Sequence, residues 1–136
     1  MAETLQLRIV TPTRLLFDER VREITAPGTL GEFGVLPNHI AFLTSLEIGT
    51  LRYRAEDEPQ RIAIRGGFAE VADNVMTVLA EDAAFPEDVD PDAARAELAA
   101  ANAQLRELSP LEPAFAAADA TRRWTEAQLE VVASTR

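Results

Sequence analysis

Residues 31–44 read GEFGVLPNHIAFLT, and this stretch decides how the first half of the chain folds. Two glycines, a proline and an asparagine interrupt the apolar residues at short intervals, which is typical of tight connections between short strands. All six glycines of the chain fall between Gly28 and Gly67, and we interpret Gly28, Gly31 and Gly34 as turn glycines. The pattern favours antiparallel β-structure over helix.

On both sides of this stretch, apolar and polar residues alternate with a period of two, which predicts strands. The candidate strands are residues 5–9, 21–26, 51–54, 61–65 and 75–79. Turn signals separate them at 11–12, 27–28, 37–38, 58–59 and 73–74. We therefore expect a small antiparallel β-sandwich over residues 1–85.

The character of the chain changes at residues 85–91, which read FPEDVDP. Two prolines and three acidic residues interrupt the strand pattern, so residues 86–91 are interpreted as a linker. Asp90 is placed to cap a helix that has Pro91 at its first position. A second domain, residues 92–136, follows without any glycine.

Two helical stripes are expected in this second domain, broken near Ser109 and Pro110. The first stripe consists of Ala94, Leu98, Ala101, Leu105 and Leu108, and the second of Ala117, Ala120, Trp124, Ala127 and Val131. Their spacing predicts an antiparallel helical hairpin with the stripes facing each other. Because alanine buries little area, we expect the hairpin to dock on the sandwich or on a partner.

Composition excludes several classes of function. The chain has no cysteine, its 13 basic residues are all arginine, and its formal net charge is −10. Disulfides, a phosphate-loop lysine and a Schiff-base lysine are therefore absent, and neither nucleic acid nor an anionic lipid surface is an expected partner. His39 is the single histidine, so no metal site or cofactor is expected from histidine ligands. No apolar run approaches the ~20 residues that would insert into a membrane, and the start of the chain lacks the pattern of a secretion signal, so a cytosolic protein is expected.

Three blocks in the front half resemble the epsilon subunits of bacterial F-type ATP synthases. Residues 31–44 carry the glycine-phenylalanine-glycine and proline-x-histidine signature, residues 65–71 and 73–80 (RGGFAEV and DNVMTVLA) are similar to the second block, and residues 7–12 to the opening strand. The resemblance implies a non-catalytic rotor subunit without chemistry of its own. Its implied partners are the gamma subunit, the polar loops of the c-ring and, through the hairpin, the catalytic alpha/beta head.

The resemblance also implies a place and an interface for the protein. It would lie at the cytoplasmic face of the bacterial inner membrane as a peripheral part of a proton- or sodium-translocating synthase. The residues implied at the c-ring and gamma interface are Gly31, Glu32, Phe33, Gly34 and His39. Within this set, Glu32 corresponds to the acidic contact with the c-ring loop, and His39 lies near the gamma contact.

A regulatory ligand is the third implication. Residues 92–96, DAARA, are similar to a motif through which some family members bind ATP, helped by arginines of the second helix. The implied nucleotide-binding residues are Asp92, Arg95, Arg122 and Arg123. The alternative is that these arginines form solvated ion pairs with Asp119 and Glu126, which lie at helical spacing from Arg122. Acidic residues outnumber arginines on the second helix, so weak inhibition of ATP hydrolysis is expected from the hairpin.

Two other classes of protein remain as alternatives. A sandwich that recognises a small ligand would expose aromatic side chains, whereas the single tryptophan, Trp124, falls on a helical stripe. A hydrolase would have to use a carboxylate pair such as Glu70 and Asp73 without a histidine, lysine or cysteine partner. Binding to the gamma subunit discriminates the rotor subunit from both.

Overall fold

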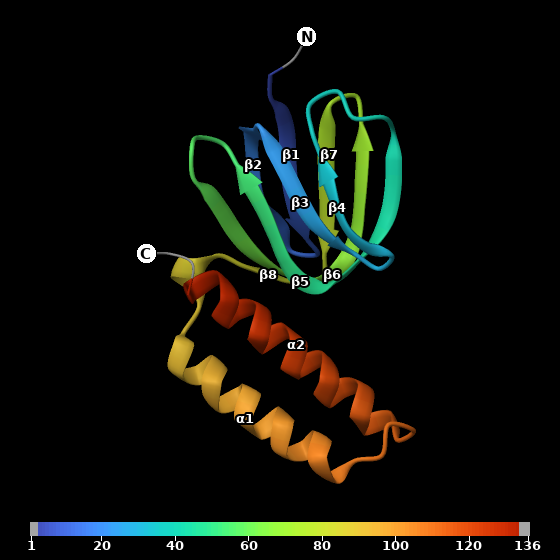
Figure 1. The fold of residues 1–136 in the computed structure, drawn as a ribbon, viewed down its shortest axis with the longest axis vertical. Helices are drawn as coiled ribbons and strands as arrows, with labels where there is room; N and C mark the ends of the chain where they lie inside the picture. The colour runs from blue at the N-terminus through green and yellow to red at the C-terminus, as the bar shows by residue number, and fades with distance from the viewer. Residues whose placement is uncertain (1–2, 134–136) are drawn as a thin grey trace.

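A computed structural model describes residues 3–133, so the outer ends of the two predicted domains, residues 1–2 and 134–136, lie outside the described part. Figure 1 shows a β-sandwich followed by two antiparallel helices, which confirms the predicted fold class. The strands are β1 Leu5–Thr11, β2 Arg14–Val21, β3 Glu23–Gly28, β4 Gly31–Val35, β5 Phe42–Arg54, β6 Pro59–Ala72, β7 Val75–Ala80 and β8 Ala83–Ala84. The helices are the 3₁₀ turn η1 Pro86–Asp88, α1 Pro91–Glu107 and α2 Pro113–Ala133.

The strands form one hydrogen-bonded path in the order β2-β1-β7-β6-β5-β3-β4, with β8 paired to β6. Strands β1 and β7 are parallel, and the other pairs are antiparallel. The 13 residues of β5 and 14 of β6 are long enough to run through both layers of the sandwich. The later half of β6 pairs with β7 and its earlier half with β8, so this strand joins the two layers.

Alternation in the strands sorts the core from the surface. Leu5, Leu7 and Ile9 are fully buried, as the pattern of residues 5–9 predicts. In β7 the buried residues include Met76 and Val78. The core consists of these residues together with Val21, Ile24, Val35, Leu51, Ile62, Ile64 and Val71, among others.

Of the three glycines interpreted as turn residues, Gly28 and Gly31 flank the turn between β3 and β4, whereas Gly34 lies inside β4. Gly66 and Gly67 interrupt β6 with positive φ angles of 70° and 123°. A Cβ atom on Gly67 would lie 2.0 Å from the carbonyl oxygen of Leu79, so only glycine fits against β7 here. Strands β2, β4 and β8 and most of β5 were not predicted. In β2 and β5 apolar residues occur on both faces, so the alternation that marks a half-buried strand is absent.

The hairpin begins where the sequence predicts. The carboxylate of Asp90 accepts hydrogen bonds from the backbone N–H groups of Asp92 (3.1 Å) and Ala93 (3.2 Å), and Pro91 is the first helical residue. Helix α1 packs on α2, and α2 packs on β5, β6 and η1, so α2 lies between α1 and the sandwich (Figure 1). Within residues 3–133, no helix combines the length and hydropathy that crossing a membrane requires.

The second helical stripe does not face α1 as predicted. Trp124, Ala127 and Val131 pack instead against the sandwich, in a cluster with Ala63 and Ala84. The spacing of apolar residues shows which side of a helix is buried but not which neighbour buries it. The expectation that the hairpin docks on the sandwich is confirmed.

Candidate partner-binding surface

An apolar row crosses the outer face of the sandwich. Strand pairing places Leu15 beside Val10, Val10 beside Leu79, and Leu79 beside Phe68, so side chains from β2, β1, β7 and β6 form one line. Leu15, Phe68 and Leu79 are 53%, 57% and 53% exposed. We call these four residues the apolar row, and no other element described in residues 3–133 covers them.

A hollow of about 410 Å³ lies beside the apolar row. Most of its lining is apolar, and its residues are Val10, Thr11, Pro12, Gly67, Phe68, Leu79, Ala80 and Glu81. A contiguous exposed apolar surface marks a site of interaction with another molecule. The hollow and the row together offer a ridge and a groove to a protein partner.

Charged groups flank the apolar row on the next register of the same face. Nε of Arg8 lies 3.2 Å from Oδ1 of Asp18, which also accepts a hydrogen bond from the side chain of Gln6. The Gln6 hydrogen bond is the largest of the effects that lower the pKa of the Asp18 carboxyl, and Arg8 adds to it. An apolar centre with a charged, solvent-exposed edge is the usual anatomy of a protein interface.

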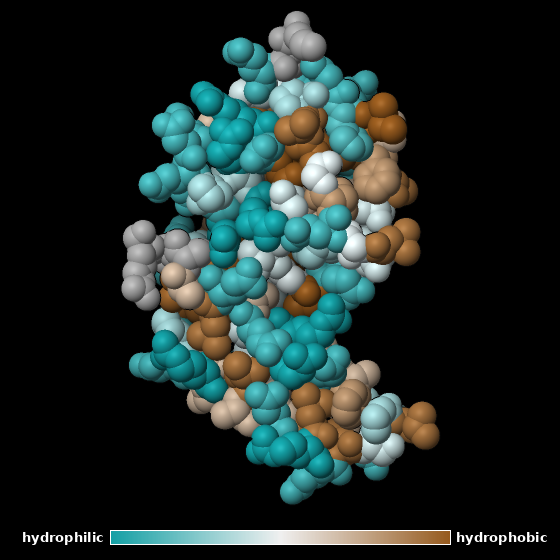
Figure 2. Space-filling model, in the orientation of Figure 1, coloured by the Kyte–Doolittle hydropathy of each residue, from teal (hydrophilic) through white to brown (hydrophobic). Residues whose placement is uncertain are grey.

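The predicted turn at Pro37 and Asn38 is confirmed, and the loop that contains it exposes large apolar side chains. Asn38 has a φ of 65°, and its backbone N–H donates to Oδ1 of Asn74 (2.8 Å). Leu36, Ile40 and Leu43 are 60%, 78% and 69% exposed. Figure 2 shows hydrophobic residues along this edge of the sandwich, on the right of the view.

His39, one of the predicted interface residues, lies in this loop with its ring edge-on to Phe42 at a centroid distance of 6.0 Å. Its Nδ1 lies 2.7 Å from the backbone oxygen of Ile40. Phe33, from strand β4, also meets Phe42 edge to face, at a centroid distance of 5.4 Å. His39 and Phe33 thus order the apolar edge of the sandwich, while their contact with a partner stays a prediction.

Gly31, Glu32 and Gly34 lie on the edge strand β4, at and beyond the tip of its hairpin with β3. One carboxylate oxygen of Glu32 lies 3.0 Å from Nη2 of Arg52, and both side chains keep contact with solvent. Leu30 at the tip is 97% exposed. The tip is accessible to a second molecule, but the charge of Glu32 is already partly compensated by Arg52.

The residues of the apolar row are not among the interface residues predicted from the sequence. Residues 75–79 were assigned to a strand, but the alternation did not show that Leu79 points to solvent while Met76 and Val78 enter the core. One feature of the sequence could have identified the row: β7 carries apolar residues on both faces, which indicates that another element or molecule packs on each face. The structure supplies the cover on one side only.

The four residues predicted to bind nucleotide form two separate groups. Nη1 of Arg95 lies 2.8 Å from Oδ1 of Asp92 in the first turns of α1. Arg122 and Arg123 lie on α2 and line a hollow of about 260 Å³ against β5, which neither Asp92 nor Arg95 lines.

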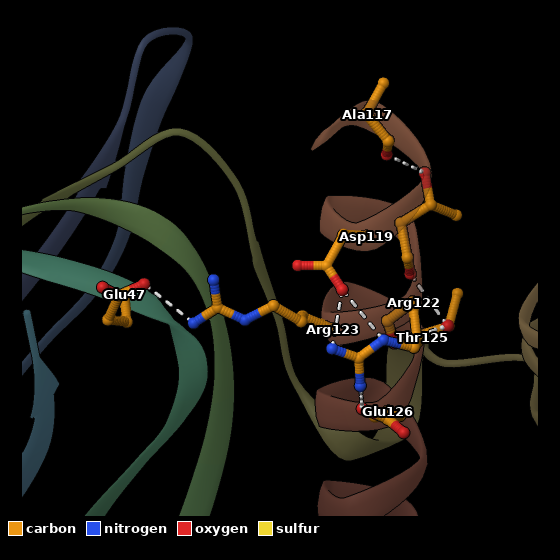
Figure 3. Close-up of polar contacts among 8 residues, drawn as sticks. Glu47, Ala117, Asp119, Arg122, Arg123, Thr125 and Glu126 are labelled. Atoms are coloured by element: carbon orange, nitrogen blue, oxygen red, sulfur yellow. Dashed lines mark hydrogen bonds and ion pairs between the residues drawn. The ribbon is translucent and has the colours of Figure 1, made fainter. Parts of the chain in front are cut away.

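Figure 3 shows how the two arginines of α2 are held. Nε and Nη2 of Arg122 lie 3.0 and 2.7 Å from Oδ1 of Asp119, and its Nη1 lies 2.9 Å from Oε1 of Glu126. The Asp119 hydrogen bond is the largest cause of a raised pKa for Arg122. Arg123 reaches across to Glu47 of β5, with Nη2 to Oε2 at 2.7 Å. The guanidinium groups therefore already have carboxylate partners, and ATP binding stays a prediction.

A β-sandwich with one exposed apolar face and a docked helical hairpin is typical of a subunit that binds other proteins in a larger complex. The family model of the ATP synthase delta/epsilon chain β-sandwich domain matches residues 4–86, which is more than half of the chain. The chain therefore belongs to the ATP synthase delta/epsilon chain family, and its curated relatives are ATP synthase epsilon chains.

Two relatives and two structures show the extent of the likeness. The ATP synthase epsilon chain of Nitratidesulfovibrio vulgaris (strain DSM 19637 / Miyazaki F) is 54% identical over 70% of this chain and 71% of its own. That of Geotalea uraniireducens (strain Rf4) is 41% identical over 98% of this chain and 96% of its own. A chain of the Euglena gracilis mitochondrial ATP synthase (OSCP/F1/c-ring) has a TM-score of 0.81 with 26% identity, covering 98% of this chain and 83% of that one. A chain of the Tetrahymena thermophila ATP synthase central stalk and c-ring, at 20% identity and a TM-score of 0.59 over 93% of this chain and 95% of that one, shares the fold.

Proposed function

We propose that this chain is a non-catalytic rotor subunit of the central stalk of a proton- or sodium-translocating F-type ATP synthase. It couples the catalytic head to the c-ring by holding the gamma subunit. The apolar row is the observation that carries the proposal, because its half-exposed Phe68 and Leu79 require a hydrophobic partner. Membership of the epsilon-chain family supports gamma as that partner.

The mechanical role follows from rigidity and contact. A close-packed core holds the strands of the apolar row at fixed spacing, so a force applied to this face is transmitted through the whole sandwich. Burial of Leu15, Phe68 and Leu79 against gamma supplies affinity, and the Arg8–Asp18 pair at the edge fixes the register. A coupling element needs both properties and no chemistry of its own.

The hairpin tip between β3 and β4 is proposed to rest on the polar loops of the c-ring. Leu30 and Glu32 are accessible there. Gly31 has a φ of 124°, which favours glycine, and because it has no side chain its backbone can approach a partner closely. Arg52 reduces the negative charge of Glu32, so this contact sets orientation more than affinity. The subunit then lies at the cytoplasmic face of the inner membrane, as a peripheral member of the complex.

Weak regulation of ATP hydrolysis is proposed for the hairpin, acting on the catalytic alpha/beta head. Asp119, Glu126 and Glu130 of α2 pair with arginines of the chain itself, so few free positive charges remain for an acidic surface of the head. Truncation after Asp88 should therefore leave the ATPase rate of the head within a factor of about two. A many-fold rise on truncation would contradict weak inhibition.

The rotor role is tested by co-purifying the chain with the gamma subunit of its own synthase. A stable equimolar complex is expected from the full-length chain. Phe68→Ala, which removes an exposed side chain of the apolar row, should weaken the complex. Leu111→Ala is its control, because Leu111 is also apolar but lies in the connection between α1 and α2 and not in the row. Failure of the folded chain to bind gamma would overturn the proposal and favour a ligand-binding sandwich.

A further inference from the structure

The contact between the hairpin and the sandwich depends on a row of small residues. Thr50 of β5 pairs with Ala63 of β6, and Ala63 pairs with Ala84 of β8, so the three side chains share one face. On that face Ala63 and Ala84 pack against α2 in a cluster with Trp124, Ala127 and Val131. The small residues form a shallow seat into which the larger side chains of the helix fit.

Thr50 is an unusual member of this seat. It is 7% exposed, and its Oγ1 is a buried side-chain oxygen that makes no hydrogen bond with any residue in the part of the chain that the structure describes. Leaving a buried hydroxyl unpaired disfavours the closed state by roughly 5- to 100-fold relative to a state in which water reaches it. Valine would keep the β-branched shape that favours a strand without this penalty.

Polar contacts surround the seat and have a different character. Arg123 of α2 meets Glu47 of β5 at 2.7 Å, with side chains 36% and 39% exposed. Arg61 and Glu130 lie 3.8 Å apart, and the guanidinium of Arg65 stands 5.9 Å above the Trp124 ring. Half-exposed ion pairs contribute little individually and are screened by salt. The contact between the hairpin and the sandwich thus has three parts. They are a small apolar centre, an unpaired buried hydroxyl that destabilises it, and surrounding ion pairs that salt can screen.

We propose that Thr50 is a built-in destabilising contact that keeps the docked hairpin close to opening, and that the Glu47–Arg123 pair is the salt-sensitive contact that holds it closed. Opening returns water to the Thr50 hydroxyl, which offsets part of the cost of exposing Trp124 and Val131. The inference deepens the proposed regulation by the hairpin and rests on it for its use in the synthase. The opening itself is a property of the isolated chain.

Trp124 is the single tryptophan and reports the opening directly. In the isolated full-length chain, opening is measured by amide hydrogen exchange in α2 and by quenching of Trp124 fluorescence. Thr50→Val should lower the opening constant about 10-fold, because it removes the unpaired hydroxyl and keeps the shape. Thr50→Ser keeps the hydroxyl and should not lower it. Thr77→Val, the same exchange on the opposite face of the sandwich, should leave it unchanged.

The ionic contact is tested separately. Glu47→Gln should raise the opening constant about two- to fivefold at low salt and reduce its dependence on ionic strength. An opening constant for Thr50→Val that equals or exceeds that of the parent chain, with the sandwich still folded, would overturn the role of Thr50. These measurements use no gamma subunit, so their failure is distinct from a failure to bind gamma.

Discussion

Replacing Phe68 by alanine isolates the contribution of the apolar row to gamma binding. Phe68 is 57% exposed. A phenylalanine carries about 200 Å² of surface, so the exchange removes roughly 80 Å² that gamma would bury. At about 25 cal/mol per Å², the loss is about 2 kcal/mol, which is a roughly 30-fold weaker Kd.

The assay is a calorimetric titration of purified gamma subunit with the parent chain and, separately, with the Phe68→Ala variant. The Phe68 side chain points away from the core, so the free energy of unfolding should change by less than about 0.5 kcal/mol. Leu111→Ala is the matched control, because it removes apolar surface that is 94% exposed in another part of the fold. Equal gamma affinity of Phe68→Ala and the parent chain, or an equal loss in Leu111→Ala, would refute the assignment of the row.

Three further predictions concern the fold. Asp90→Ala should destabilise the hairpin by about 1 kcal/mol, measured by helix-resolved amide exchange, since it removes the cap of α1. Gly67→Ala should destabilise the sandwich by about 3 kcal/mol or more in urea unfolding, because its Cβ would collide with β7. Burial, followed by the charges of Glu19 and Glu87, raises the pKa of Tyr53, so its phenolate absorbance should appear above the usual pH of 10.0. Because the pKa of Tyr53 is raised in the folded state, its contribution to the free energy of unfolding is fully present below pH 10.0. This contribution should be lost as the pH rises through the folded pKa.

The fold class could be predicted because local patterns agree with it. Residues 5–9 alternate and bury Leu5, Leu7 and Ile9, and the turn residues Asn38 and Asn74 have positive φ angles. Asp90 caps α1 as its position before Pro91 predicts. Each of these features depends on neighbours in sequence, so periodicity and turn chemistry are sufficient to find them.

The ion pairs of Arg122 were also within reach of the sequence. Asp119 and Glu126 lie three and four residues from it on one helix, and the structure shows the pairing that was left open as the alternative to nucleotide binding. The partner of Arg123 was not, because Glu47 lies 76 positions away. A contact across that separation depends on how α2 packs on β5.

The sequence by itself determined the sandwich, the change of structure after Phe85, the capped start of α1 and the family, because each depends on residues close together along the chain. Only the tertiary structure decided which apolar residues are covered. Trp124 packs on the sandwich and not on α1, and Phe68 and Leu79 are exposed. The Thr50 hydroxyl is buried and has no hydrogen-bond partner within residues 3–133. Burial depends on the register of distant strands and on which face a second element covers, and neither is encoded in a local pattern.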